Sequence, residues 1–483
     1  MKKNSLTTAV VAGIAGVAGF AGLASAVELN PDGLGQVLIY PYYTVNKSQD
    51  SLFSVVNTDL EFAKAVKVRF LEGYNSREVL DFNLYLSAAD VWTARVSQLS
   101  DEGGAAVFTT DTSCTWPPIP AGGAPFRAEA YNGGSVFPKD SGPQDITRTR
   151  EGYMELIEMG MVTPGSPLEA AVTHDQTGAP GEGVPACTAN VIGNTNAGNY
   201  VDEPTGGLFG SGAIVNVGEG TFFGYNADAI QGFSDVQLFS GSSGLTPSLA
   251  QANSIGSVAG GAIAYVFEGD GTLLTLDYAA GIDAVSAVFT ADALYNEYLV
   301  NPDLGANTDW VVTFPTKRFY VDTYYNSGTV IDPFVENFAG GASFVEVGIA
   351  LFDQEEGFTT QPDDFSPPIS TRPSSLPYEV NVISFLTDTA AGDPSGVFGS
   401  FLRANINPYG AAGWLRLDLA TGDGGHALRP ALNGNVLHGL PATGFEAYNV
   451  INANAQPGSL ANYSGLFRHR ASRLCTSDVG ACS

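Results

Sequence analysis

The sequence has few cationic residues. It contains 21 Lys and Arg against 50 Asp and Glu, which gives a formal net charge of -29 at pH 7. No Lys or Arg occurs between Arg150 and Lys317, although that stretch holds 19 acidic residues. Because nucleic acids and anionic lipid surfaces attract positive charge, the composition argues against both as partners. An acidic surface is instead typical of a soluble exported protein.

The chain also lacks the common motifs of enzyme active sites. It has no HExxH, GxSxG, Walker A or CxxCH motif, and no GxGxxG after residue 26. Its four histidines are His174, His426, His438 and His469. His426 follows Asp423 in a Gly-rich segment, which a turn explains. A Ser-His-Asp triad or a carboxylate pair can still assemble from distant positions, so a secreted hydrolase is a less favoured alternative to a non-catalytic protein.

Long apolar runs are scarce, and the longest one is at the N-terminus. Lys2 and Lys3 precede the apolar stretch 9–24, and Ala-Ser-Ala ends at Ala26, which is the pattern of a cleaved signal peptide over residues 1–26. No later stretch approaches the ~20 apolar residues that a membrane span needs. We expect a mature chain that begins near Val27, has no transmembrane span, and resides in the periplasm, at the cell surface or outside the cell.

Cysteine is rare as well. The four cysteines, Cys114, Cys187, Cys475 and Cys482, all follow the signal peptide, and an oxidising compartment favours disulfides. Four cysteines allow three pairings. Proximity in sequence favours Cys114 with Cys187 and Cys475 with Cys482. A metal site is disfavoured because no CxxC pair or nearby histidine accompanies them. Cys114 lies in a loop-rich segment that has little apolar burial, so a crosslink would constrain it.

The residues that are abundant predict a mainly β fold. Charged residues make up only 15% of the chain, which has 58 Gly, 28 Phe and 20 Tyr. Alternation places Val66, Val68 and Phe70 on one face of a strand, with Lys67 and Arg69 on the other. Four such strands fall between residues 50 and 96. We predict an antiparallel β-sandwich, immunoglobulin-like or double, with long loop insertions and one or two short helices.

Three further segments carry local predictions. The residues around Gly218 to Gly220 predict a hairpin turn. Helical spacing predicts a helix within residues 282–300, capped by Asp283. Residues 308–322 read as a hairpin that turns at Pro315. The predicted organisation has four parts: a signal peptide (1–26), N-terminal sandwich strands (27–111), a loop-rich insertion that a disulfide holds in place (112–212), and a second β-rich region (213–483). The alternative is that the strands of the second β-rich region complete a sheet of the first.

Several strings resemble a group of uncharacterised exported bacterial proteins. They are "GQVLIYPYYTV", "SREVLDFNLYLSAADVWTA", "TREGYMELIEMG" and "TDWVVTFPTKRFYVD". The resemblance covers most of the chain after residue 26 and implies one integrated architecture. Locally, "SVVNTDLEFAKAVKVRFLE" and "DFNLYL" are similar to immunoglobulin-like sandwiches of bacterial surface proteins. Neither resemblance implies particular catalytic residues, and fold analogy does not assign a function.

Acidic loops and tryptophans supply the candidate binding residues. Calcium takes six to eight oxygen ligands, and the best candidates are Asp353, Glu355 and Glu356; two weaker groups are Glu268, Asp270 and Asp277, and the pair Asp363 and Asp364. Solvated turns are the competing explanation. Of the four tryptophans, Trp92 and Trp310 lie in alternating strands and are expected in the core. Trp116 precedes two prolines in a loop and is the candidate for a glycan-binding surface, to which Trp414 could also contribute.

A cluster of arginines near the C-terminus suggests self-assembly. Arg468, Arg470 and Arg473 are basic residues that could dock on the acidic middle of another copy and form a homo-oligomer or a cell-surface polymer. The competing explanation is an exposed basic tail. We therefore predict a secreted or cell-surface structural or adhesive protein, with a calcium- or glycan-binding extracellular module as the alternative.

Overall fold

The computed structural model describes residues 26–174, 183–193, 195–254, 256–360, 374–385, 392–422, 425–452, 456, 458–477 and 482. The predicted signal peptide, except Ala26, lies outside the described residues. Val27, the predicted start of the mature chain, is fully buried, and its backbone hydrogen-bonds with Ile263 and Tyr265.

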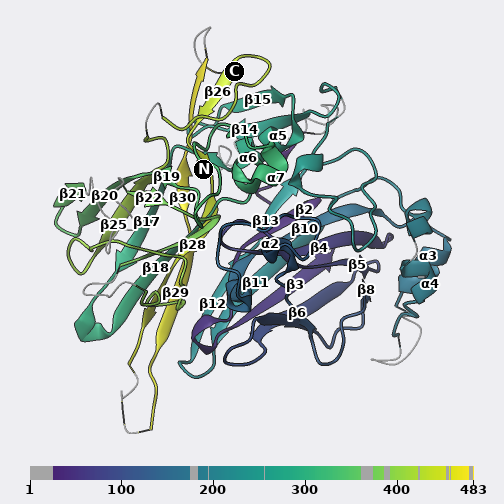
Figure 1. The fold of residues 1–483 in the computed structure, drawn as a ribbon, viewed down its shortest axis with the longest axis horizontal. Helices are drawn as coiled ribbons and strands as arrows, with labels where there is room; N and C mark the ends of the chain where they lie inside the picture. Colours follow the sequence, from purple (N-terminus) through teal and green to yellow (C-terminus); the bar gives the residue numbers. More distant parts are fainter. Residues whose placement is uncertain are drawn as a thin grey trace, which may run out of the picture.

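The first half of the chain forms two antiparallel sheets that pack face to face, and we call them the N-terminal sandwich (Figure 1). The seven-stranded sheet has the order β1 (Glu28–Leu29), β13 (Asp228–Gln231), β2 (Val37–Thr44), β10 (Glu151–Met161), β4 (Lys64–Glu72), β5 (Glu78–Leu86), β8 (Cys114–Trp116). The six-stranded sheet has the order β12 (Thr221–Asn226), β11 (Leu208–Asn216), β3 (Asp50–Asn57), β6 (Val91–Gln98), β7 (Ala105–Phe108), β9 (Ala124–Pro125).

Two five-stranded sheets form the C-terminal sandwich, at the left of Figure 1. The outer sheet has the order β21 (Phe358–Thr360), β20 (Gly348–Asp353), β25 (Ala412–Asp418), β17 (Ala293–Leu299), β30 (Arg470–Ser472). The inner sheet has the order β24 (Arg403–Asn405), β23 (Val380–Ser384), β18 (Ala306–Thr313), β28 (Thr443–Val450), β29 (Tyr463–Arg468). The prediction of a mainly β, antiparallel, sandwich-type fold is confirmed.

Short elements connect and cap the sheets. Four two-stranded ribbons pair β14 (Ala262–Phe267) with β15 (Leu273–Tyr278), β16 (Thr290–Ala291) with β27 (Leu440–Pro441), β19 (Val345–Glu346) with β22 (Ser375–Leu376), and β26 (Asn435–His438) with β31 (Leu474–Ser477). The α-helices are α2 (Glu129–Asn132), α3 (Pro167–Val172), α4 (Ala189–Ile192), α5 (Gly281–Phe289), α6 (Arg318–Val321) and α7 (Thr323–Asn326). The 3-10 helices are η1 (Asn46–Ser48), η2 (Ile146–Arg150), η3 (Thr195–Tyr200), η4 (Leu249–Gln251) and η5 (Pro302–Leu304). None of the described helices has the length and apolarity to cross a membrane.

The apolar core consists of three clusters, and the two largest lie on opposite faces of the inner sheet. The inner sheet presents one face to each half: Trp310 and Ile383 pack in the core cluster of the C-terminal sandwich, whereas Val311 and Phe445 belong to the cluster of the N-terminal sandwich. Tyr225 of β12 stacks on Phe445 of β28 with ring centroids 5.1 Å apart. The two halves are therefore joined by side-chain packing across the inner sheet.

Two local predictions are wrong in part. The helix predicted within residues 282–300 exists only as α5, and Asp283 lies inside it, because the following residues alternate and form β17 between β25 and β30. The hairpin predicted at Pro315 is instead the end of β18 followed by α6. Burial of two cations explains this turn: Lys317 donates to the Ser343 carbonyl and Arg318 pairs with Glu155 at 2.9 Å. The hairpin at Gly218 to Gly220 is confirmed, since Asn216 of β11 pairs with Thr221 of β12.

The polar face of β4 is buried, which the alternation alone did not predict. Lys67 and Arg69 are covered and form ion pairs with Asp81 and Glu78 of β5. Lys64 pairs with Glu158 at 2.9 Å in the same sheet. Many of the scarce cations are thus used inside the N-terminal sandwich.

Candidate functional site

A groove lies on the outer face of the six-stranded sheet, and we call it the outer groove. Its volume is about 810 Å³. Ser211 of β11 pairs with Ser54 of β3, which pairs with Thr93 of β6, and Asn226 of β12 completes this row. The alternation of these strands turns Phe53, Val55 and Trp92 into the core and the polar row outward. The centre of the groove is therefore lined by hydroxyl and amide groups.

The side chains of the neighbouring row are small at its β12 end and large at its β7 end. Gly224, Ala213 and Leu52 lie side by side on β12, β11 and β3, and Arg95 and Phe108 continue the row on β6 and β7. Phe222 of β12 also lines the groove and is 59% exposed. Because Ala213 is small, a ligand can reach the sheet there, between the exposed ring of Phe222 and the half-buried ring of Phe108.

The lining of the outer groove has no acidic side chain, although the Asp111 carboxylate beside it accepts hydrogen bonds from the Thr93 N–H and hydroxyl groups. None of the 17 described residues that line it is Asp or Glu, although the chain has 50 of them. Its cation is Arg95, whose guanidinium carbon lies 4.8 Å from the centroid of the Phe108 ring. Among the described residues, Arg95 forms no ion pair. The ring orients the guanidinium by a cation–π contact and leaves its N–H donors available.

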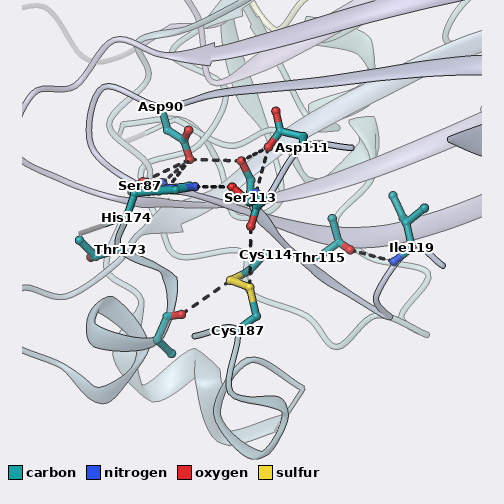
Figure 2. The surroundings of a disulfide bond; sticks show 12 residues. Ser87, Asp90, Asp111, Ser113, Cys114, Thr115, Ile119, Thr173, His174 and Cys187 are labelled. Carbon is teal, nitrogen blue, oxygen red and sulfur yellow. Dashed lines mark hydrogen bonds and ion pairs between the residues drawn. A yellow bond between two sulfur atoms is a disulfide. The ribbon is translucent and has the colours of Figure 1, made fainter. Parts of the chain in front are cut away.

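The disulfide predicted between Cys114 and Cys187 is present, and so is the one between Cys475 and Cys482. The first joins β8, at the edge of the seven-stranded sheet, to the segment before α4 (Figure 2). Trp116, the predicted glycan-binding residue, is half-buried on β8, where its ring packs against Gly193. It lies outside the residues that line the outer groove.

A cluster of serine, histidine and aspartate lies next to this disulfide (Figure 2). His174 Nδ1 is 2.7 Å from Ser87 Oγ and 3.5 Å from Asp90 Oδ2, and its Nε2 is 3.1 Å from Thr112 Oγ1. In a Ser-His-Asp triad the serine and the aspartate contact opposite ring nitrogens. Here Ser87 and Asp90 both approach Nδ1 of His174. Asp90 therefore does not hold the opposite side of the ring, as it would have to if His174 accepted a proton from Ser87 in a triad.

His426 has a structural role in the fold. Its two ring nitrogens lie 3.0 Å from the Pro333 carbonyl and 2.9 Å from the Glu346 carbonyl, and the residue is buried. Asp423, its neighbour in the sequence, lies outside the described residues. The buried His426 side chain thus connects its own loop to the Pro333 loop and to β19, which accounts for the site-like character of this segment.

The predicted calcium ligands form the turn between β20 and β21. The Asp353 carboxylate accepts hydrogen bonds from the backbone N–H groups of Glu355 and Gly357 at 3.0 and 2.7 Å, and Glu355 and Glu356 are exposed. In the part of the chain that the structure describes, no three His, Cys, Asp or Glu side chains come together as metal ligands. The described residues therefore give the calcium prediction no ligand set. The alternative residues Asp363 and Asp364 lie outside them.

Two of the three C-terminal arginines lie on strands, and Arg473 lies between β30 and β31 (Leu474–Ser477). Arg468 of β29 forms an ion pair with Asp228, and Arg473 donates to the Val288 carbonyl at 3.2 Å. Both line a cavity of about 360 Å³ beside β1 and β13. Arg470 of β30 is exposed and lies opposite Tyr295 of β17. The cluster is thus divided: only Arg470 lies on the outer sheet of the C-terminal sandwich.

The sequence predictions missed the outer groove. Strands β3 and β6 were predicted, so alternation could have placed Ser54, Thr93 and Arg95 on one exposed face. The other half of the groove comes from β11 and β12, some 150 residues later in the chain, and no local sequence pattern connects these strands with β3 and β6.

Comparison of the chain with protein-family models, curated proteins and solved structures found no match. The groove is therefore interpreted from its own chemistry.

Proposed function

We propose that this is an exported adhesive protein that binds an acidic glycan in the outer groove and does not act as an enzyme. The observation that carries the proposal is a groove with a central row of hydroxyl and amide side chains and no acidic lining residue, in which Arg95 has no ion-pair partner among the described residues, in a chain of net charge -29. Export rests on the signal-peptide pattern of residues 1–26. Polymers anchored at a surface are the natural ligands of an adhesive protein with an open groove.

The shape and chemistry of the groove suit a sugar chain better than a peptide. Extended peptides are commonly bound along a sheet edge, where free backbone groups continue the ladder. The floor of the outer groove is instead the face of a sheet, where the backbone groups of β3 and β11 pair with neighbouring strands on both sides. Hydroxyl and amide side chains match the many hydroxyl groups of a sugar, and exposed aromatic rings pack on its apolar face.

The charge of the groove favours an acidic sugar. A guanidinium forms two parallel hydrogen bonds with a carboxylate, as on a uronic acid. With a neutral glycan, the N–H groups of Arg95 would stay hydrogen-bonded to water and would have no carboxylate partner. The surrounding acidic surface would repel an anionic polymer everywhere except at the groove, which directs binding to this face.

Binding of oligogalacturonate to the mature, disulfide-bonded protein tests the proposal. We expect Arg95→Gln to weaken binding by about 10-fold to 150-fold, because a hydrogen bond to a charged group is worth about 1.5–3 kcal/mol. Ala213→Trp should abolish binding by filling the middle of the groove. Neutral cello-oligosaccharides of equal length should bind more weakly than oligogalacturonate to the wild-type protein and should be insensitive to Arg95→Gln. Isothermal calorimetry at low and physiological salt gives these affinities.

Arg127→Gln is the matched control, because Arg127 is exposed outside the groove and the variant loses the same charge. It should bind like the wild type. The proposal is wrong if oligogalacturonate does not bind, or if its affinity is unchanged in both Arg95→Gln and Ala213→Trp. Equal affinity for neutral and acidic oligosaccharides would reject the acidic ligand.

A further inference from the structure

The outer sheet of the C-terminal sandwich exposes a stack of aromatic side chains. Trp414 of β25 and Phe352 of β20 have parallel rings with centroids 4.0 Å apart, and Phe358 of β21 lies 6.0 Å from Phe352. Trp414 is 39% exposed and Phe358 is 65% exposed. Tyr295 of β17 lies 6.5 Å from Trp414. Clustered exposed aromatic side chains mark interaction sites on soluble proteins.

Alternation along the strands creates this face. On β25, Leu415 and Leu417 point into the core, so Trp414 and Arg416 point outward. On β20, Ile349 and Leu351 are buried and Phe352 lies outward. The inner side of the sheet covers β18 and β23, and Figure 1 shows the sheet on the side of the C-terminal sandwich that faces away from the N-terminal one.

Opposite charges lie on the two sides of the stack. The exposed Glu355 and Glu356 form the turn that joins β20 to β21, at one edge of the sheet. Arg470 is exposed on β30, at the other edge. Among the described residues, neither Arg470 nor the two glutamates form an ion pair. The aromatic stack thus lies between a cation and carboxylates that have no ion-pair partner in the part of the chain that the structure describes.

We propose that this face packs on the same face of a second copy of the chain, in a dimer with two-fold symmetry. In a two-fold contact, residue i of one copy meets residue j of the other, and j meets i. A half-turn about an axis through the middle of the sheet brings each Arg470 next to the acidic turn of the other copy. The same rotation lays one aromatic stack across the other.

The charge pattern selects a second copy over other partners. Two chains that each carry a net charge of -29 repel one another unless opposite charges meet locally. Arg470 and the acidic turn supply this match twice in one contact. The aromatic rings supply apolar area, and tryptophan and tyrosine are the residue types that dominate binding energy in the centre of interfaces. A dimer would also present two outer grooves to one polymer, which raises adhesion by avidity.

Charge-exchanged variants test the dimer. Arg470→Glu places two acidic groups together at each contact, and the double variant Glu355→Arg/Glu356→Arg places basic groups together. Each variant alone should be monomeric in sedimentation velocity under conditions in which the wild type dimerises. Mixed together they should form a heterodimer, because each of the two contacts then joins a carboxylate of one copy to a guanidinium of the other.

Trp414→Ala tests the contribution of the aromatic stack to the dimer contact. The dissociation constant of the variant's dimer should be at least about 30-fold higher than that of the wild type, as for a tryptophan at the centre of an interface. Arg127→Glu is the matched control, since it reverses an exposed arginine in the N-terminal sandwich and should leave the dimer unchanged. A wild-type protein that stays monomeric at every concentration would overturn the proposal. So would polymers larger than a dimer, or a mixture of the charge variants that stays monomeric.

Discussion

In the N-terminal sandwich, most buried carboxylates are paired with cations, whereas the C-terminal sandwich buries Glu446 and His469 without a partner of opposite charge among the described residues. Arg148 illustrates the first case. Its guanidinium lies 2.7 Å from both Glu72 and Asp140, and all three side chains are buried. Burial raises the pKa of Glu446 to about 8, with Glu297 nearby adding to the shift, and burial lowers the pKa of His469 to about 3.

The difference follows from where the chain places its cations. Strands β17 and β18 fall in the stretch between Arg150 and Lys317 that has no Lys or Arg. Asp309 of β18 is therefore held by neutral donors instead, namely Ser384, Ser395 and the backbone N–H groups of Val397 and Phe398. This chain places most of its buried cations in one of its halves. The two halves should respond differently to mutation and to pH.

The largest effect is expected from breaking the paired charges. Arg148→Met leaves Glu72 buried without its cation, and removing one partner of a buried pair costs about 3–5 kcal/mol. We expect a loss of this size in the free energy of unfolding at pH 7, measured with guanidinium chloride. The fraction of folded protein at physiological temperature should fall as well.

Arg416→Met in the C-terminal sandwich is the matched control. Arg416 pairs with Asp418 at 2.9 Å, but its side chain is 37% exposed. An exposed ion pair is worth about 0–1 kcal/mol. Similar losses in the two variants would contradict the contrast between buried and exposed pairs.

A second effect, dependent on pH, is expected in the C-terminal sandwich. The Glu446 carboxyl keeps its proton in the folded protein up to pH about 8, whereas its ordinary pKa is 4.5. Because the pKa of Glu446 is higher in the folded than in the unfolded protein, the folded protein binds this proton more tightly. The contribution of Glu446 to the free energy of unfolding is therefore full below pH 4.5 and is lost as the pH rises toward 8. Glu446→Gln removes this loss, which is at most about 1.4 kcal/mol per pH unit.

Unfolding curves at pH 5 and pH 8 for the wild type and Glu446→Gln measure the difference. The variant should gain stability relative to the wild type as the pH rises. His469 acts in the opposite direction, because a lowered folded pKa favours the native state above pH 6.5 and weakens it as the pH falls. It is present in both proteins and cancels in the comparison. Parallel pH profiles would show that Glu446 is not the cause.

The sequence predicted the local strands better than their partners. Alternation located β3, β4, β5 and β6, because apolar and polar residues alternate in the sequence of each strand. It assigned Lys67 and Arg69 to an outward face, but it could not show that distant segments cover that face. It extended a helix through residues 293–299, because the β25 and β30 residues that make this segment a strand lie more than 100 positions away. Pairing between distant segments is absent from any local pattern.

The candidate sites show the same limit. Both disulfides were predicted from spacing, since each joins cysteines that are neighbours in the order of the chain. Trp116 and Trp414 were named together, but only the structure shows that Trp414 is stacked on an exposed sheet while Trp116 packs against Gly193. Arg95 attracted no notice in the sequence. It is distinguished by lying in a groove whose described lining residues include no Asp or Glu, and that is a property of the folded surface.

The smallest difference between the halves concerns the two disulfides, one in each half. Cys114–Cys187 closes a loop with a sequence separation of 73, and Cys475–Cys482 closes one of 7. If a crosslink stabilises by restricting the unfolded chain, the long loop is worth about 4.5 kcal/mol and the short one about 2.5 kcal/mol. Replacing both cysteines of one pair by serine should therefore cost about 2 kcal/mol more for Cys114 and Cys187 than for the other pair. Unfolding in guanidinium chloride measures both losses, and an equal or reversed order would show that each disulfide acts on the native state and not on the unfolded chain.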